Sequence, residues 1–104
     1  MKQLTVVVRP ITAEAVLKAI SDLDINAVVV QAAKGFSRQK GYLKRYKGSE
    51  YSMAFLPKVE IRLWVSDARA QEVADKITKV ARTGRIGDGK IFIVDVGWPG
   101  AMEF

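Results

Sequence analysis

Apolar and polar residues follow one another along the chain with the periods of strands and helices. Residues 4–8 and 27–30 are short runs rich in β-branched side chains, which predict two strands. Residues 59–65 alternate apolar and polar side chains, so they predict a strand with one face in the core. Residues 91–96 predict a last strand.

Two segments between these strands repeat apolar residues at the spacing of one helix face. The two stripes are Ala13, Val16, Leu17 and Ile20, then Val73, Ile77, Val80 and Ala81. We expect Thr12 to cap the first helix, and Ser66 or Asp67 to cap the second, which should end near residues 83–84. The order of elements is therefore β-α-β, a long loop, and β-α-β.

This order predicts an α+β fold, the ferredoxin-like sandwich, with both helices on one face of an antiparallel sheet. No linker divides the sequence, so we expect residues 1–104 to form a single domain. Residues 6–8 and 28–30 are apolar at consecutive positions, so apolar side chains point to both sheet faces. We infer that other subunits bury the second face. The alternative is that Trp64, Phe92 and the C-terminal tail cover it within one chain.

Histidine and cysteine are both absent, and this excludes several kinds of site. Without cysteine there is no disulfide, thiolate nucleophile or Cys-ligated metal. Without histidine there is no Ser-His-Asp triad and no imidazole ligand. A metal would have to be a hard cation such as Mg²⁺, arriving with a phosphate-bearing ligand. The N-terminus has no leader pattern and no apolar stretch approaches the ~20 residues of a membrane span, so we expect a cytoplasmic protein.

The net charge of +6 is concentrated in one segment. Residues 34–58 hold seven basic residues against Glu50 alone, whereas the rest of the chain has ten basic and ten acidic residues. Because 49% of the sequence is hydrophobic, a folded core can carry this positive segment.

The strongest local motif is residues 83–90, between the second helix and the last strand. Three glycines in six residues let backbone amides converge on an anion, and Arg85 and Lys90 add positive charge. Each charge-assisted hydrogen bond to a phosphate contributes about 1.5–3 kcal/mol, so a few suffice for micromolar affinity. The motif is neither a Walker A loop nor a Rossmann fingerprint, because a strand follows it. A tight helix-to-strand connection with solvated charges is the alternative interpretation.

A second motif, residues 34–41, opens the long loop. Loops of this length in a compact domain are usually functional or disordered. Large apolar side chains alternate with the basic ones, which suits either nucleic acid or an arm that docks into a partner protein. A solvated basic loop would explain the charges but not these side chains, which are Phe36, Tyr42, Tyr46, Tyr51, Met53 and Phe55.

Four motifs, at residues 34–41, 46–51, 55–58 and 81–92, together resemble those of the P-II nitrogen-regulatory signal-transduction family. The resemblance implies a homotrimer of ferredoxin-like subunits that is not an enzyme. Such a protein binds ATP or ADP in the clefts between subunits, and 2-oxoglutarate beside a magnesium–ATP complex. Its T-loop, here about residues 37–55, changes shape to control a target protein such as a membrane transporter.

The resemblance implies nucleotide-binding residues in both loops. Arg38 would lie near the phosphates, Gly35 and Phe36 near the nucleotide at the base of the T-loop, and Trp64 near the adenine base, with plain sheet packing as its alternative role. The B-loop, at about residues 82–90, would hold the phosphates through Gly87, Asp88, Gly89 and Lys90.

The resemblance also implies effector and partner residues. Gln39 would coordinate Mg²⁺ and Lys58 would pair with a 2-oxoglutarate carboxylate, which suits an amide oxygen and an ammonium group. Lys40 lies at the same hinge of the loop, where a small anionic effector would bind. Tyr51 matches a tyrosine that is uridylylated in some members. The tip residues that would meet a partner are Lys44, Arg45 and Tyr46.

Several positions depart from the usual family pattern. Residues 97–104 contain no basic residue, where members commonly have an Arg-rich C-loop that reaches the neighbouring subunit's phosphates. We therefore expect a weaker preference for a triphosphate. Arg62 stands where an acid is usual, and Ser37 where glycine is frequent. These departures indicate a divergent or P-II-like member.

Two other functions fit parts of the sequence. A nucleic-acid-binding module on the same scaffold would use the basic aromatic loop and lose affinity steeply with salt, but it leaves residues 84–90 unexplained. A small phosphoryl-transfer enzyme is disfavoured, because the chain lacks His, Cys and evident paired carboxylates. The prediction is therefore a signal-transduction regulator that binds adenine nucleotide and acts through its T-loop.

Overall fold

The computed structural model describes residues 1–35, 56–85, 88–97, 102 and 104. These residues form a four-stranded sheet, two α-helices and one 3₁₀ turn. In chain order the elements are β1 (Lys2–Val8), α1 (Pro10–Ile20), β2 (Ala27–Gly35), β3 (Leu56–Val65), η2 (Asp67–Arg69), α3 (Ala70–Ala81) and β4 (Gly89–Asp95).

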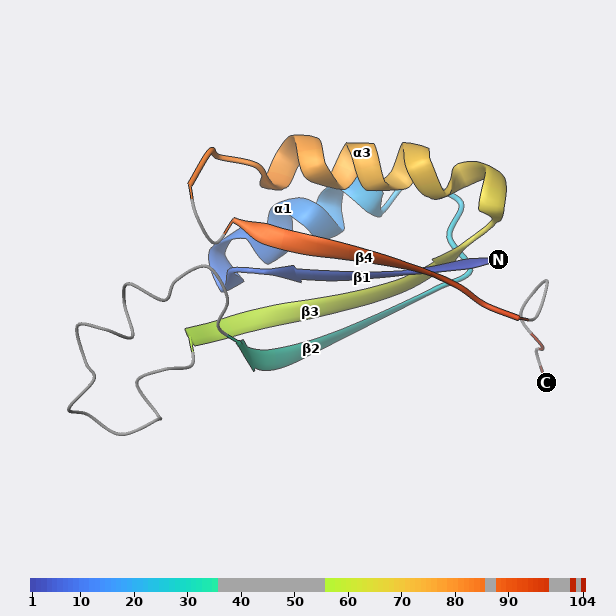
Figure 1. The fold of residues 1–104 in the computed structure, drawn as a ribbon, viewed down its shortest axis with the longest axis horizontal. Helices are drawn as coiled ribbons and strands as arrows, with labels where there is room; N and C mark the ends of the chain where they lie inside the picture. The colour runs from blue at the N-terminus through green and yellow to red at the C-terminus, as the bar shows by residue number, and fades with distance from the viewer. Residues whose placement is uncertain (36–55, 86–87, 98–101, 103) are drawn as a thin grey trace.

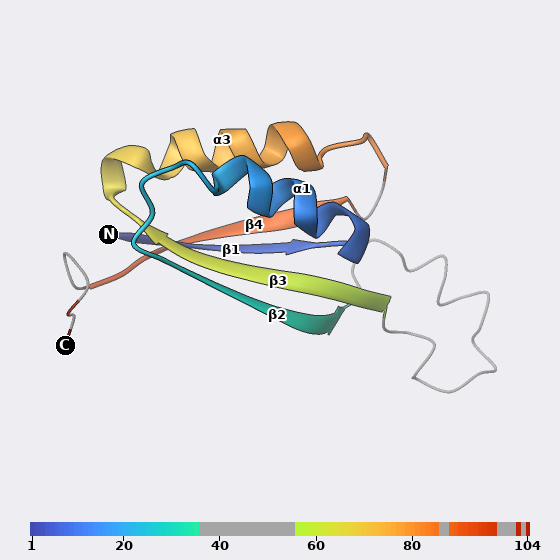
Figure 2. The same ribbon diagram turned by 180° about the vertical axis from the view of Figure 1, so that it is seen from behind.

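The sheet has the strand order β2-β3-β1-β4, and its neighbouring strands all run antiparallel. Both helices lie on the same face of this sheet, as the two opposite views in Figures 1 and 2 show. The expected ferredoxin-like α+β fold is confirmed.

The hydrophobic core lies between the two central strands and the helices. Alternate residues of β1 and β3 point into it, because successive strand side chains face opposite sides of a sheet. Each fully buried Leu or Ile side chain stabilises the fold by about 1.5–3 kcal/mol. The completely buried residues include Leu4 and Val6 of β1, Ile61 and Leu63 of β3, Val16 of α1, and Val73 and Ile77 of α3.

The predicted cap of the first helix is wrong, and Ser66 stands at the N-cap of the second helical segment without forming a side-chain cap. Helix α1 begins at Pro10, with Arg9 at the N-cap, because proline is favoured at a first helical position that needs no amide donor. Thr12 lies inside the first turn, where its amide donates to the Arg9 carbonyl at 2.9 Å. Ser66 precedes the 3₁₀ turn without a side-chain cap, and α3 ends at Ala81, slightly before the expected end.

Strand β2 is longer than the apolar run that predicted it. It continues through Gln31 and Ala33 to Gly35, which is paired with Leu56 of β3. The pairing with β3 extends the strand into residues that carry no alternating pattern, since one partner strand suffices to order an edge strand. The base of the long loop is therefore ordered sheet.

The sheet face opposite the helices keeps an apolar surface exposed. Val29 of β2 is 38% exposed, and Phe92 and Val94 of β4 are 51% and 54% exposed. Met102, in the described part of the tail, is also mostly exposed. In the part of the chain that the structure describes, neither Phe92 nor the tail closes over this face.

The end of the sheet that holds Met1 is tied together by short contacts. The terminal amine lies 2.9 Å from Asp67 Oδ1. The Val96 amide donates to the Met1 carbonyl at 2.9 Å, and the Lys2 ammonium pairs with Asp95. These contacts lie at the end of β1 opposite the one that leads into α1.

Candidate functional site

The sheet register brings the two sequence motifs to one edge of the molecule. Strand β1 ends at Val8, which is opposite Val59 of β3 and Gly89 of β4. Arg9 directly follows β1. If the antiparallel register is continued by one residue, Lys58 lies on one side of Arg9 and Asp88 on the other. The base of the long loop and the glycine motif therefore converge at the ends of these strands (Figure 1).

Two of these charged residues, Arg9 and Lys58, lie at positions whose side chains face the side of the sheet that the helices leave open. Arg9 keeps an extended backbone, with φ −68° and ψ 150°, so the alternation of β1 continues and Arg9 follows Val7 on that face. Lys90 of β4 is directly opposite Val7 and is exposed. The candidate site thus combines the open face with the loop edge.

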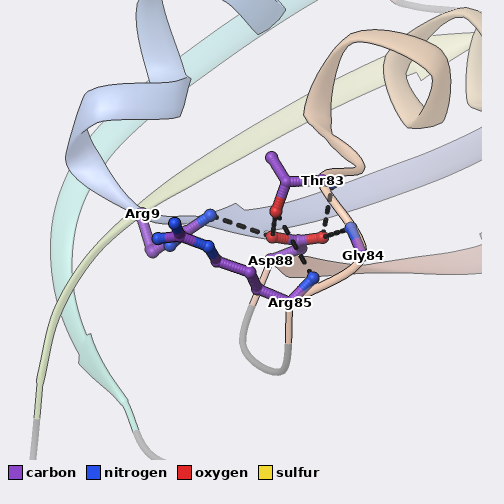
Figure 3. Close-up of polar contacts among 5 residues, drawn as sticks. All are labelled: Arg9, Thr83, Gly84, Arg85 and Asp88. Carbon is purple, nitrogen blue, oxygen red and sulfur yellow. Dashed lines mark hydrogen bonds and ion pairs between the residues drawn. The ribbon is translucent and has the colours of Figure 1, made fainter.

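A network of hydrogen bonds closes the loop between α3 and β4 on the Asp88 carboxylate (Figure 3). One oxygen, Oδ2, accepts from the Thr83 amide at 2.6 Å and from the Gly84 amide at 2.9 Å. The other oxygen, Oδ1, accepts from the Thr83 hydroxyl and from Arg9 Nη2, the latter at 2.9 Å. Donors from two distant parts of the chain, Arg9 and residues 83–84, therefore converge on one side chain.

The same contacts keep Asp88 ionised. Hydrogen bonds from the Thr83 hydroxyl and amide, then from the Gly84 amide, together with the positive charge of Arg9, lower the pKa of Asp88 below its ordinary value. The carboxylate side chain is only 15% exposed, so solvent competes little for these donors. The negative charge of Asp88 is thereby compensated by Arg9 and by the donors of residues 83–84.

Two glycines are required by the path of the loop. Gly84 has φ +88°, the left-handed conformation that follows α3 and that side-chain-bearing residues rarely adopt. At Gly89 a Cβ atom would lie 2.8 Å from the Val7 carbonyl oxygen and 2.9 Å from Val8 Cγ1. Gly89 therefore lets the end of the loop approach the backbone of β1.

Positive charge collects beside this loop. Lys58 is only 8% exposed, and burial, followed by the nearby charge of Arg9, lowers its pKa. The Nε atom of Arg9 is buried without a hydrogen-bond partner among the described residues. Figure 3 shows the Arg85 side chain extending from the loop toward Arg9. An anionic ligand at this edge would offset the mutual repulsion of Lys58 and Arg9.

Trp64 lies away from this edge within one chain. It is opposite Gln3 of β1 and Ala27 of β2, six positions along β3 from Lys58. At ~3.3 Å per residue these two residues are about 20 Å apart. A single subunit therefore does not bring Trp64 to the glycine loop.

The structure describes the positions of part of the predicted residue set. Asp88, Gly89, Lys90 and Lys58 meet at the loop edge, where Gly35 ends the neighbouring strand β2. The other predicted residues lie outside the described ranges: Phe36, Arg38, Gln39, Lys40, Lys44, Arg45, Tyr46, Tyr51 and Gly87. The binding roles of both groups of residues stay predictions.

Arg9 is the residue that sequence reasoning missed. In the sequence it is an isolated basic residue between the first β-rich run and Pro10, outside every motif. The pairing of β1 with both β3 and β4 places it between Lys58 and Asp88, and no local pattern encodes that pairing.

In the segments the structure describes, no helix is long and apolar enough to cross a membrane. No cluster of three or more acidic side chains that could hold a metal ion occurs among those residues either.

Comparisons with known proteins match nearly the whole chain. A family model described as nitrogen regulatory protein P-II matches residues 1–97. Nitrogen regulatory protein GlnK of Escherichia coli K12 is 46% identical over 96 residues, which cover 92% of this chain and 86% of that protein. Nitrogen regulatory protein P-II of Rhizobium meliloti is 41% identical over the same coverage. The P-II protein of Rhodospirillum rubrum is 42% identical over 93 residues, 89% of this chain and 83% of that protein.

Proposed function

The chain belongs to the P-II nitrogen regulatory protein family, whose members are signal-transduction regulators, and we propose that it binds an adenine nucleotide, ATP or ADP, at the loop of residues 84–90. The observation that carries this proposal is the loop itself. Gly84 and Gly89 give it an unusual path, Asp88 holds its first residues, and Arg9 and Lys90 border it with positive charge. A glycine-rich loop whose ends are fixed and that has cations beside it is suited to bind phosphate.

The nucleotide site is completed by a second subunit of a homotrimer. The face that carries Lys90 also exposes Val29, Phe92 and Val94, an apolar surface that a neighbouring copy would bury. Trp64 lies about 20 Å along β3 from Lys58 at ~3.3 Å per residue. Contact of Trp64 with a base whose phosphates lie at the glycine loop therefore requires the Trp64 of a neighbouring copy.

A small carboxylate effector, 2-oxoglutarate in the simplest case, binds beside Lys58. The described residues bring the cations Arg9, Lys58 and Lys90 to this edge, and its carboxylate, Asp88, is already bonded to Arg9 and to the loop, which fits an anionic ligand that carries its own magnesium. Gln39 would complete the coordination of Mg²⁺ with the nucleotide phosphates. Lys58 pairs with the carboxylate, and this pairing would offset the burial that lowers the Lys58 pKa.

Ligand occupancy at this edge sets the shape of the T-loop. Its two ends, Gly35 and Leu56, are paired with each other at the end of β2 and β3, so both leave the sheet beside the ligands. A cytoplasmic target protein, such as a membrane transporter, would then read the loop through Lys44, Arg45, Tyr46 and Tyr51.

Isothermal titration calorimetry tests the proposal directly. ATP, ADP and AMP are titrated separately into the full-length protein, each with and without Mg²⁺ and 2-oxoglutarate. We expect micromolar binding of ATP or ADP, about −8 kcal/mol, and a higher affinity for 2-oxoglutarate when Mg²⁺ and ATP are present. Absence of binding by all three nucleotides would remove the nucleotide proposal. If nucleotide binds but 2-oxoglutarate does not change its affinity, only the proposal that 2-oxoglutarate is the effector is refuted.

A further inference from the structure

We propose that Asp88 and Arg9 are positioning residues: together they hold the glycine loop in its ligand-binding shape before a nucleotide arrives, and the Asp88 carboxylate itself touches no ligand. This inference rests on the proposed nucleotide site. It assigns to Arg9 a role that the sequence motifs did not suggest. It also divides the B-loop residues into those that contact the nucleotide and those that hold the loop in the conformation that binds it.

The hydrogen bonding of Asp88 carries the first step. An ionised carboxylate has about four acceptor positions, and four donors occupy them here (Figure 3). Two of these donors are the consecutive amides of Thr83 and Gly84. No acceptor position remains for a bound magnesium ion or a ligand hydroxyl. The carboxylate therefore serves the chain's own backbone.

These bonds join the two ends of the loop. Thr83 and Gly84 follow α3, and Asp88 precedes the first residue of β4. The Asp88 amide also donates to the Arg85 carbonyl at 3.4 Å, and the Arg85 amide approaches the Thr83 hydroxyl at 3.4 Å. The described ends of the loop are therefore held together without a ligand, so a phosphate would meet a loop whose ends are already fixed. Preorganisation of this kind raises affinity, because the loop loses little conformational entropy when the ligand binds.

Arg9 anchors the closed loop to the sheet and balances its charge. It occupies the N-cap of α1, and its Nη2 lies 2.9 Å from Asp88 Oδ1. A carboxylate beside a polyphosphate would repel it, and the guanidinium cancels that repulsion. The Asp88 carboxylate can therefore hold the loop in place, while Arg9 compensates its negative charge toward the ligand.

A positioning role and a purely electrostatic role of Asp88 predict opposite changes in ADP affinity when the carboxylate is removed, which makes the proposal testable. If Asp88 were only a nearby negative charge, Asp88→Ala would strengthen ADP binding. If Asp88 positions the loop, the same change weakens ADP binding by about tenfold, the loss of one charge-assisted contact. A metal ligand would produce a loss only in the presence of Mg²⁺, so the titration is made without it.

The experiment combines two measurements on the full chain. NMR amide hydrogen exchange of Thr83 and Gly84 is recorded without nucleotide, and ADP affinity is measured by calorimetry without Mg²⁺. In Asp88→Ala we expect both amides to exchange at least about tenfold faster, with weaker ADP binding. Thr83→Val, which removes the hydroxyl, is expected to weaken binding, and Thr83→Ser to restore it. Arg9→Met is expected to weaken binding more than Arg9→Lys.

Coupling between the variants separates positioning from direct contact. In the Asp88→Ala background, Thr83→Val is expected to cause little further loss, because both changes open the same network. Unchanged exchange of the two amides, or tighter ADP binding by Asp88→Ala, overturns the inference. If the wild-type protein binds no ADP, the proposed function fails, while the exchange rates still decide whether Asp88 holds the loop. If Asp88→Ala does not fold, the Thr83→Val and Thr83→Ser pair gives the same decision.

Discussion

Replacement of Gly89 by alanine should destabilise the protein by about 3 kcal/mol. The added Cβ would lie 2.8 Å from the Val7 carbonyl oxygen and 2.9 Å from Val8 Cγ1, and the first of these is backbone that cannot rotate away. Overpacking of this kind costs about 1–3 kcal/mol. The φ of +156° at Gly89 adds about 1 kcal/mol or more of backbone strain. Because the contact lies where β4 joins β1, its relief requires separation of the two strands.

Two other glycines provide matched controls for this substitution. At Gly84 an added Cβ meets nothing within 4 Å, but φ is +88°, so Gly84→Ala should cost only the strain, about 1–2 kcal/mol. At Gly97 there is open space and no positive φ, so Gly97→Ala should change stability by no more than ~0.5 kcal/mol. Urea unfolding of all three variants at one protein concentration gives the comparison. A Gly89→Ala protein as stable as Gly97→Ala would refute the steric reasoning.

Three further outcomes follow from burial, exposure and charge. Ile61→Ala, at a site with no exposed side-chain surface, should lower the free energy of unfolding by about 2–5 kcal/mol, whereas Ile11→Ala, at a site 85% exposed, should change it by no more than ~0.5 kcal/mol. Light scattering should give the mass of three chains, and Phe92→Glu on the open sheet face should reduce that mass, while Ile11→Glu should not. Asp88 has a lowered folded-state pKa, so its stabilisation is complete above its ordinary pKa and is lost as the pH falls through the lowered value. Below about pH 4, near the ordinary pKa of an aspartate, the melting temperature of the wild type should therefore fall more steeply than that of Asp88→Asn.

The hydrophobic pattern predicted the elements because it directly reflects burial. The alternation of residues 59–65 and the stripe that includes Val73 and Ile77 correspond to side chains that the structure buries. The limits of elements were predicted less well, since they depend on contacts outside the element. Pro10 moved the start of α1, and pairing with β3 extended β2 beyond its apolar run.

The candidate site was predictable as a motif but not as a geometry. The three glycines indicated a turn toward an anion, and Asp88 was grouped with them as one more phosphate-binding residue. Its four hydrogen-bond donors include Arg9, which is 79 positions away in the sequence, and that contact exists only because β1 pairs with β4. A sequence shows which residue types are available, whereas register decides which of them meet.

The arrangement of β1 has a practical consequence for experiments on single molecules and surfaces. This seven-residue strand separates the Met1 end of the sheet from the loop edge by about 20 Å. At the Met1 end, the Val96 amide is bonded to the Met1 carbonyl, so the chain that leaves β4 emerges beside the N-terminus. A surface tether attached after Asp95 would hold the protein with its glycine loop directed away from the surface. The terminal amine is a poorer attachment point, because its modification would break the ion pair with Asp67.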